Sequence, residues 1–387
     1  MLEAMALPAP ETAELFRHVV KGCAESLLAD FLTACRETSS TEEASARRYV
    51  ERAVERGFPA DALWTPLLSA LEASVTGAPR DALRSRALLV SIAWQLATSG
   101  VRGEFETTRP GLEPRRLGAW MLPPHGGLHL SSDGERAHVR LDGVEGGSSR
   151  SFGFVPGRVP RLVELGDVET WRSCGEIVRG TLILNGGIER FVGHAHLADL
   201  VEACGEEAAH VHDAAIRLMR TYASGYETWV STAVRAVIPL RAANGAINSG
   251  SSREEAGVVH ASVDCCAEAY AEMLVHEASH QYFHALARIG PVDDGNDRTL
   301  YHSPVKECGR PIRMILLAYH AFANVVLLGR RAVASGYADP SGYFAANERF
   351  LCPILDELER SLRCTRALTL NGESLWHPLS KALEKGS

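Results

Sequence analysis

Several features are scarce in this sequence of 387 residues. Aromatic residues make up only 7%, and the nine cysteines include no CxxC pair. Cations do not outnumber anions, with 40 Lys and Arg against 48 Asp and Glu. The resulting formal charge of −8 argues against a broad phosphate-binding surface, so we expect no nucleic-acid partner. An odd number of scattered thiols favours reduced core cysteines over a disulfide framework, which predicts a cytoplasmic location.

Long apolar runs are scarce as well. The longest, Met314 to Leu328, contains His320 and Asn324 and is shorter than the roughly 20 residues that a membrane span needs. We therefore expect a buried helix there and no association with a membrane. Residues 1–10 contain Glu3 and no basic stretch, so no signal peptide is expected.

The spacing of Gly, Pro and apolar residues divides the chain into helical and strand-rich segments. Apolar residues recur at helical spacing through residues 1–105, which predicts a helical N-terminal subdomain. Residues 111–192 form short runs bounded by Gly and Pro, as turn-bounded strands do, and residues 206–387 are mostly helical. We expect an α+β fold, predominantly helical, in which a second domain at 106–387 carries the chemistry.

One motif points to a metal. His276-Glu277-Ala278-Ser279-His280 is an HExxH sequence on a helix that we expect to follow Asp264 and to end near Ile289. Two histidines four residues apart lie on one helical face, so both imidazoles can reach one ion at about 2.0–2.1 Å. Apolar residues precede the motif, and a buried neutral imidazole needs a partner. The alternative is a pair of core histidines hydrogen-bonded to the backbone.

A catalytic metal needs a further protein ligand. We expect His320 to provide it, because a histidine in so apolar a helix is costly to bury unpaired, and because that helix must pack centrally. The result would be a zincin-like HExxH helix packed on a second ligand helix. The alternative is a core histidine bonded to Asn324 or Tyr319, and Glu307 and His302 are rival ligands. His284, one further turn along the helix, could contact the ligands without binding the metal itself. The pairs His194/His196 and His210/His212 are expected to be surface or capping histidines.

The segment before the His320 helix is rich in cations. Arg310 and Arg313 flank the start of that helix, and Lys306 is close by. A helix N-terminus beside an arginine is a natural carboxylate receptor. The segment is therefore predicted to bind an acidic co-substrate or a peptide carboxylate, unless these are ordinary surface cations.

Three segments together resemble the HExxH-motif peptide-modification family: Gly257 to Val263, Leu274 to Gln281, and Tyr301 to Pro311 with the apolar helix that follows. Members are encoded with ribosomally made precursor peptides of natural-product pathways. The resemblance spans residues 110–335 and is carried by its last third. The family commonly has Trp, Arg and Pro where this chain has Val305, Lys306 and Gly309.

The resemblance implies an Fe(II)/2-oxoglutarate-dependent hydroxylase acting on the β-carbon of a peptide side chain. His276, His280 and His320 would bind iron and leave positions for 2-oxoglutarate and dioxygen. Arg310 or Arg313 would pair with the distal carboxylate of 2-oxoglutarate, and Glu277 would orient a ligand or the peptide. The alternative enzyme is a zinc metallopeptidase with Glu277 as general base. A third, non-enzymatic interpretation is a degenerate zincin-like scaffold that binds peptides.

Overall fold

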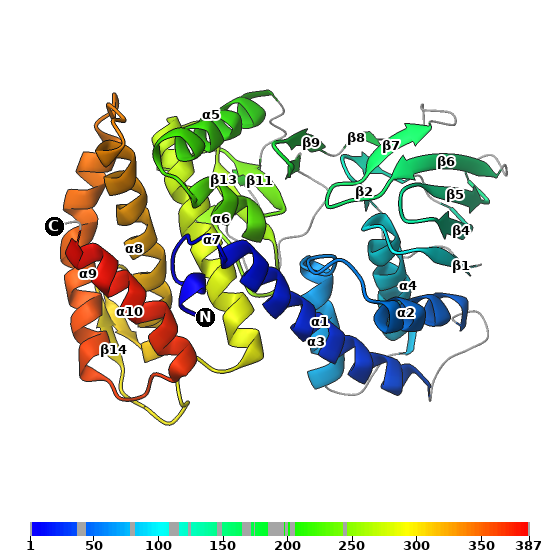
Figure 1. Cartoon of the computed structure of the whole chain (residues 1–387), viewed down its shortest axis with the longest axis horizontal. Helices are drawn as coiled ribbons and strands as arrows, with labels where there is room; N and C mark the ends of the chain where they lie inside the picture. Colours follow the sequence, from blue (N-terminus) through cyan, green and yellow to red (C-terminus); the bar gives the residue numbers. More distant parts are fainter. Residues whose placement is uncertain are drawn as a thin grey trace. The chain divides into compact units, whose positions relative to one another are not determined.

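The structure is a computed structural model of the whole chain, shown in Figure 1. It describes residues 2–36, 44–77, 82–107, 116–122, 125–144, 149–164, 172–173, 175–184, 197, 200–201, 206–242 and 246–385. Within these ranges helices and sheets are mixed, and the predicted α+β class is confirmed.

The chain divides into two compact units. Unit 1 comprises Met1–Val19, Glu189–Arg253 and Gly257–Ser387, and unit 2 comprises Val20–Ile188 and Glu254–Ala256. This division does not coincide with the boundary expected after residue 105. The strands that begin at Gly103 pack on the helices before them, so those helices and strands share one unit.

Unit 2 combines helices with an antiparallel sheet of five strands in the order β1-β4-β5-β6-β7. Its helices are α1 (Thr12–Arg36, which begins in unit 1), α2 (Ala44–Arg56), α3 (Pro66–Thr76) and α4 (Ala82–Thr98). The sheet consists of β1 (Gly103–Thr107), β4 (Gly127–Ser132), β5 (Ala137–Asp142), β6 (Arg150–Val155) and β7 (Arg161–Glu164). The remaining strands are β2 (Arg116–Leu117), β3 (Trp120–Met121), β8 (Arg172–Ser173), β9 (Gly175–Val178) and β10 (Thr181–Leu184).

Side chains alternate across this sheet as the strand period of two requires. Phe105 and Phe154 are buried, and their rings lie 5.3 Å from Tyr49 on α2 and 6.2 Å from Trp94 on α4. Helix α2 also covers the edge strand: the Tyr49 hydroxyl donates to the Val101 carbonyl, and the Ser45 hydroxyl accepts from the Glu106 amide. An edge covered in this way is closed to pairing with another chain.

Unit 1 holds a short sheet and long helices. Its strands are β11 (Ala236–Leu240), β12 (Ser249–Gly250) and β13 (Val258–Ser262), with β13 parallel to β11 and antiparallel to β12. Its helices are η1 (Leu2–Met5), α5 (Glu206–Tyr222), α6 (Tyr226–Ala233), α7 (Ala267–Ile289), α8 (Ile312–Ala334), α9 (Tyr343–Cys364) and α10 (Leu370–Lys385). The hairpin of β14 (Tyr301–Ser303) and β15 (Cys308–Arg310) joins α7 to α8, and these two helices pack side by side (Figure 1).

Helix α8 is longer than the apolar run that predicted it. Its 23 residues are long and apolar enough to cross a membrane by length and composition, so the argument from shortness was wrong. However, 72% of its most apolar window is buried inside unit 1. The helix therefore serves as a core element, as its composition predicted.

Candidate metal centre

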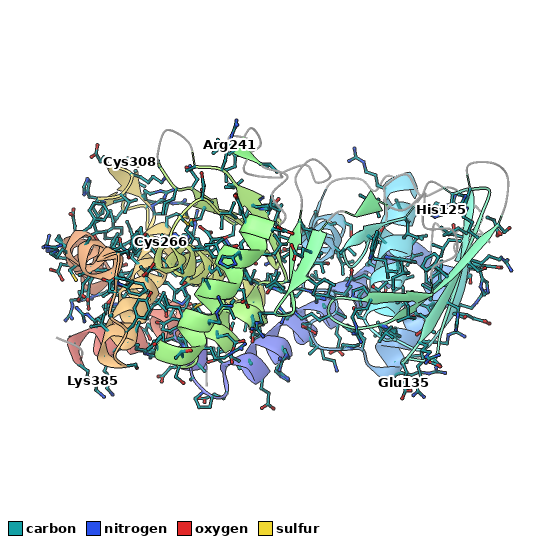
Figure 2. All side chains as sticks on the ribbon, turned by 90° about the horizontal axis from the view of Figure 1, so that it is seen from above. His125, Glu135, Arg241, Cys266, Cys308 and Lys385 are labelled. Atoms are coloured by element: carbon teal, nitrogen blue, oxygen red, sulfur yellow. The ribbon has the colours of Figure 1, made fainter. Side chains whose placement is uncertain are left out.

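The HExxH motif lies near the middle of α7, directly after the sheet of unit 1. Strand β13 leads through Asp264 into a helix that ends at Ile289, as predicted. The helix begins after Cys266, an exposed residue labelled in Figure 2, and not after Asp264. The Asp264 carboxylate instead accepts the Ala242 amide at 2.7 and 2.9 Å, which ties β11 to the start of the helix.

The two motif histidines converge. The Nε2 atoms of His276 and His280 are 3.1 Å apart, and their rings are nearly perpendicular. With ligand bonds of about 2.0–2.1 Å, this separation corresponds to an angle of about 100° at a shared ion, between the octahedral and tetrahedral values. It also allows one imidazole to donate to the other. The pair therefore fits two neighbouring positions around one metal ion.

The Glu277 carboxylate lies at the edge of the sheet, against the segment that holds β12. Its side chain is buried, with 3% of the residue exposed. The Ser249 hydroxyl donates to Oε1 and the Ser251 hydroxyl to Oε2, each at 2.6 Å. Because residues two apart in an extended segment face the same side, the two serines grip both carboxylate oxygens. Sequence reasoning missed this pair because it placed both serines in a Gly/Ser-rich loop.

His320 reaches the backbone of Ser279 within the motif, but it is not brought to the motif imidazoles. It is fully buried, its Nε2 lies 3.0 Å from the Ala6 carbonyl oxygen, and the Asn324 amide donates to the same oxygen. Burial lowers the pKa of His320 to about 4. Helix α8 does pack on α7, but its residue beside His276 is Phe322, with ring centroids 5.1 Å apart. Side chains two residues apart on a helix point in directions about 200° apart, so His320 faces a different side of α8 from Phe322. The arrangement is that of a core histidine.

The other ligand candidates are dispersed as well. Within the described ranges, no group of three or more His, Cys, Asp or Glu side chains is placed to hold a metal. Glu307 is exposed in the turn between β14 and β15, and His302 Nδ1 lies 2.6 Å from Glu357 Oε1. Burial, with Arg288 and Arg253 nearby, lowers the pKa of His284 to about 3. The fit to a metal therefore rests on two protein donors.

Of the two pairs of histidines separated by one residue, only His210 and His212 lie among the described residues. His194 and His196 lie outside the described residues. His210 is exposed on α5, as expected, whereas His212 is fully buried, so the prediction of a surface or capping role was wrong for it. Burial lowers the pKa of His212 to about 4, and its ring lies edge-on to Tyr270.

The predicted carboxylate receptor lies at one end of the α7–α8 pair. Arg310 ends β15, and Arg313 in the first turn of α8 is 54% exposed with its Nη1 3.7 Å from Asp293 Oδ2. Nine residues separate Arg313 from Phe322, the residue beside His276, which is about 13 Å along the helix axis. The structure therefore does not bring Arg313 to the imidazole pair.

Acidic residues that the sequence did not single out extend the motif face. Glu272 precedes His276 by one helical turn and accepts the Tyr343 hydroxyl, and Glu268 on the turn before accepts the Tyr337 hydroxyl at 2.7 Å. Burial raises the pKa of Glu272, while its hydrogen bond from Tyr343 and the nearby His276 oppose that change. The stripe Glu268–Glu272–His276–His280 thus places two carboxyl groups on the side of the imidazoles that faces the start of α7.

Comparison with known proteins adds no identification. No protein-family model matches the sequence, and no curated protein matches it significantly. The functional proposal therefore depends on the site and on the motif resemblance.

Proposed function

We propose that the protein is a cytoplasmic, Fe(II)/2-oxoglutarate-dependent hydroxylase that modifies the β-carbon of a side chain in a ribosomally made precursor peptide. The observation that carries this choice over a zinc metallopeptidase is the state of Glu277. A general base must aim a free carboxylate oxygen at the proton it takes. Both oxygens of Glu277 instead accept hydrogen bonds, one from Ser249 on the edge strand and one from Ser251 just after it. That geometry favours an orienting role for Glu277, of the kind the hydroxylase proposal gives it, over the role of a general base.

In this proposal His276 and His280 hold the iron, because their Nε2 atoms are spaced for one ion. When bound, the metal would supply the activation of dioxygen with 2-oxoglutarate. Imidazole ligands suit iron and leave several positions open for co-substrate. Among the described residues no third ligand adjoins the pair, and His320 would have to leave the Ala6 carbonyl to serve as one.

The geometry of the edge strand β12 favours a peptide as the substrate. Gly250 pairs with His260, and the Asn248 carbonyl accepts the Ser262 amide. The backbone groups of Asn248 and Gly250 are therefore bonded to β13. In an antiparallel pair the intervening residues turn their backbone groups outward. Ser249 therefore offers its N–H and C=O groups to an extended peptide, while its hydroxyl and that of Ser251 hold Glu277. A peptide added there would run beside the residue that adjoins His276.

The role of Arg310 and Arg313 in binding 2-oxoglutarate remains a separate prediction. The position of Arg313, paired with Asp293 at the end of α8, does not support it. If either arginine binds the distal carboxylate, its replacement by Ala should raise the KM for 2-oxoglutarate at least tenfold and leave metal content unchanged.

The deciding experiment combines protein, Fe(II), 2-oxoglutarate and a peptide encoded beside the gene for this chain, mixed without oxygen and then exposed to air. A gain of one oxygen in the intact peptide, read by mass spectrometry, supports the proposal. Shorter fragments with Zn(II) would establish the metallopeptidase instead. In that case Glu277→Gln should reduce cleavage by about 10²–10⁴-fold, because it removes the base.

Metal content gives an independent readout. His276→Ala and His280→Ala should each lower bound Fe(II) sharply while far-ultraviolet circular dichroism stays unchanged. The matched control is His302→Ala, since His302 is exposed and pairs with Glu357. Wild-type metal content in His276→Ala would refute the site, whatever the activity.

A further inference from the structure

Unit 2 carries a polar hollow on the sheet face that turns away from its core. The hollow has a volume of about 470 Å³ and is lined from two sides. Arg52 and Arg56 come from α2, Arg136 from the turn before β5, His138 from β5 and Ser131 from β4. Ser131 and His138 are cross-strand partners, so they share the exposed face of the sheet.

The positive charge of this hollow is only partly balanced by its own carboxylates. Arg52, Arg56 and Arg136 form no ion pair among the described residues; Arg52 reaches only the Glu104 carbonyl oxygen, at 3.5 Å. Of the two lining carboxylates, Asp133 accepts the amides of Glu135 and Arg136 at Oδ1, and the charges of Arg102 and Arg136 also act on it. Three guanidinium groups face two carboxylates, a net charge of +1 in a chain whose net charge is −8.

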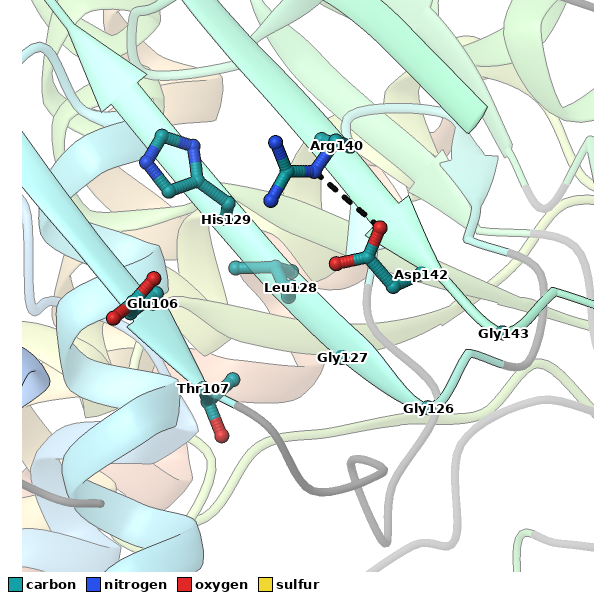
Figure 3. A pocket seen from close by; sticks show the side chains of 9 residues that line it. All are labelled: Glu106, Thr107, Gly126, Gly127, Leu128, His129, Arg140, Asp142 and Gly143. Carbon is teal, nitrogen blue, oxygen red and sulfur yellow. Dashed lines mark ion pairs between the residues drawn. The ribbon is translucent and has the colours of Figure 1, made fainter. Parts of the chain in front are cut away.

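A second hollow on the same face shows the contrast. It is lined by Glu106, His129, Arg140 and Asp142, among others (Figure 3). There the only arginine already has its counter-ion, because Arg140 Nε lies 3.3 Å from Asp142 Oδ1. Uncompensated cations therefore gather at the α2 end of the face.

Arg52 and Arg56 are placed as a matched pair. They lie one turn apart on α2, with Cβ atoms of such residues about 5–6 Å apart, and like charges at this spacing repel. In an extended peptide, side chains two residues apart project on one side at about 6.6 Å. Two carboxylates at that spacing would each meet one guanidinium group and relieve the repulsion.

We propose that this hollow binds an extended acidic peptide segment through Asp or Glu side chains two residues apart, with Arg136 and the Ser131 hydroxyl completing the contacts. The proposal rests on the proposed function in one respect: the segment would belong to the peptide substrate, apart from the residue that is modified. Unit 2 would then supply recognition, and unit 1 the chemistry.

The test is fluorescence anisotropy with a fluorescein-labelled peptide of alternating Glu and Thr, titrated with the full-length protein at low salt. We expect saturable binding that weakens as salt is raised, since ion pairs at a surface are screened. The same peptide with Gln in place of Glu should bind at least tenfold more weakly. The double variant R52Q/R56Q, and the single variant Arg136→Gln in case the double variant does not fold, should each lose at least fivefold in affinity.

The matched control is Arg161→Gln, which removes one exposed arginine from β7 at the far edge of the same sheet. Its affinity should stay within twofold of the parent. Equal binding of the Gln peptide, an equal loss in Arg161→Gln, or tighter binding of single-stranded RNA than of the peptide would overturn the proposal. The assay needs neither metal nor dioxygen. Failure to bind the acidic peptide is thus separate from failure to hydroxylate a substrate.

Discussion

Replacing Ser249 and Ser251 by Ala tests the connection between the edge strand and the motif helix. The two hydroxyls donate to opposite oxygens of Glu277, whose side chain is buried. A hydrogen bond to a charged group contributes about 1.5–3 kcal/mol, and water cannot reach a buried carboxylate to replace it. We expect each single variant to lose about 2 kcal/mol of unfolding free energy and the double variant about 3–6 kcal/mol.

The background of Glu277→Leu separates the pairing from other effects of the serines. There the hydroxyls have no carboxylate to hold, so removing them should cost less than about 1 kcal/mol. The difference between the two backgrounds is the coupling energy of the Ser–Glu–Ser contact, and contacts of this kind couple by about 0.5–3 kcal/mol. We place it at the upper end, because both oxygens are involved.

The measurement is urea-induced unfolding of the metal-free protein, followed by circular dichroism for the four variants of the cycle. Metal-free protein keeps any change in metal binding out of the comparison. A coupling energy below about 0.5 kcal/mol would refute the interpretation that Glu277 is held by the edge strand. Its carboxylate would then be free to act as a base, and the peptidase alternative would gain support.

Two further predictions concern buried histidines. His320→Ala should lower the melting temperature of metal-free and metal-loaded protein by the same amount, because the partner of His320 is the Ala6 carbonyl. A lower melting temperature in the metal-loaded protein alone would restore His320 as a ligand. Burial depresses the pKa of His212 and of His320 to about 4, so the folded state binds fewer protons than the unfolded state between pH 6.5 and 4. Stability should be full above pH 6.5 and fall as the pH drops toward 4, by up to about 3 kcal/mol for each histidine. His212→Leu should flatten this decline in thermal melts from pH 7 to 4.5, and an unchanged slope would contradict the assignment.

Local patterns predicted the parts of the site that lie close together in sequence. The four-residue spacing of His276 and His280 sets their proximity through helix geometry alone, and the strand before them was visible in its β-branched residues. The end of α7 at Ile289 followed from the Gly290 that succeeds it. These features need no knowledge of the rest of the chain.

Contacts between distant segments were not predictable in the same way. The partner of His320 is Ala6, more than 300 residues earlier, and an alanine carbonyl leaves no signal in a sequence. Apolar composition placed α8 in the core but could not tell which of its residues faces the motif imidazoles, and Phe322 rather than His320 lies beside His276. Ser249 and Ser251 looked like loop residues because a two-residue edge strand carries too little pattern to detect.

The division of the chain bears on the order in which its parts can assemble during synthesis. Nearly all of unit 2 is one continuous stretch, whereas unit 1 is made of segments before and after it. Domains generally fold as units while the ribosome is still adding residues. The hydrogen bonds of the Ala6 carbonyl can therefore form only after His320 and Asn324 have been synthesised, and unit 2 is synthesised in between. Until then, the apolar surface of the segment around Met5 also lacks α7 and α10, the helices that η1 packs against, so the nascent chain exposes it for a chaperone to shield.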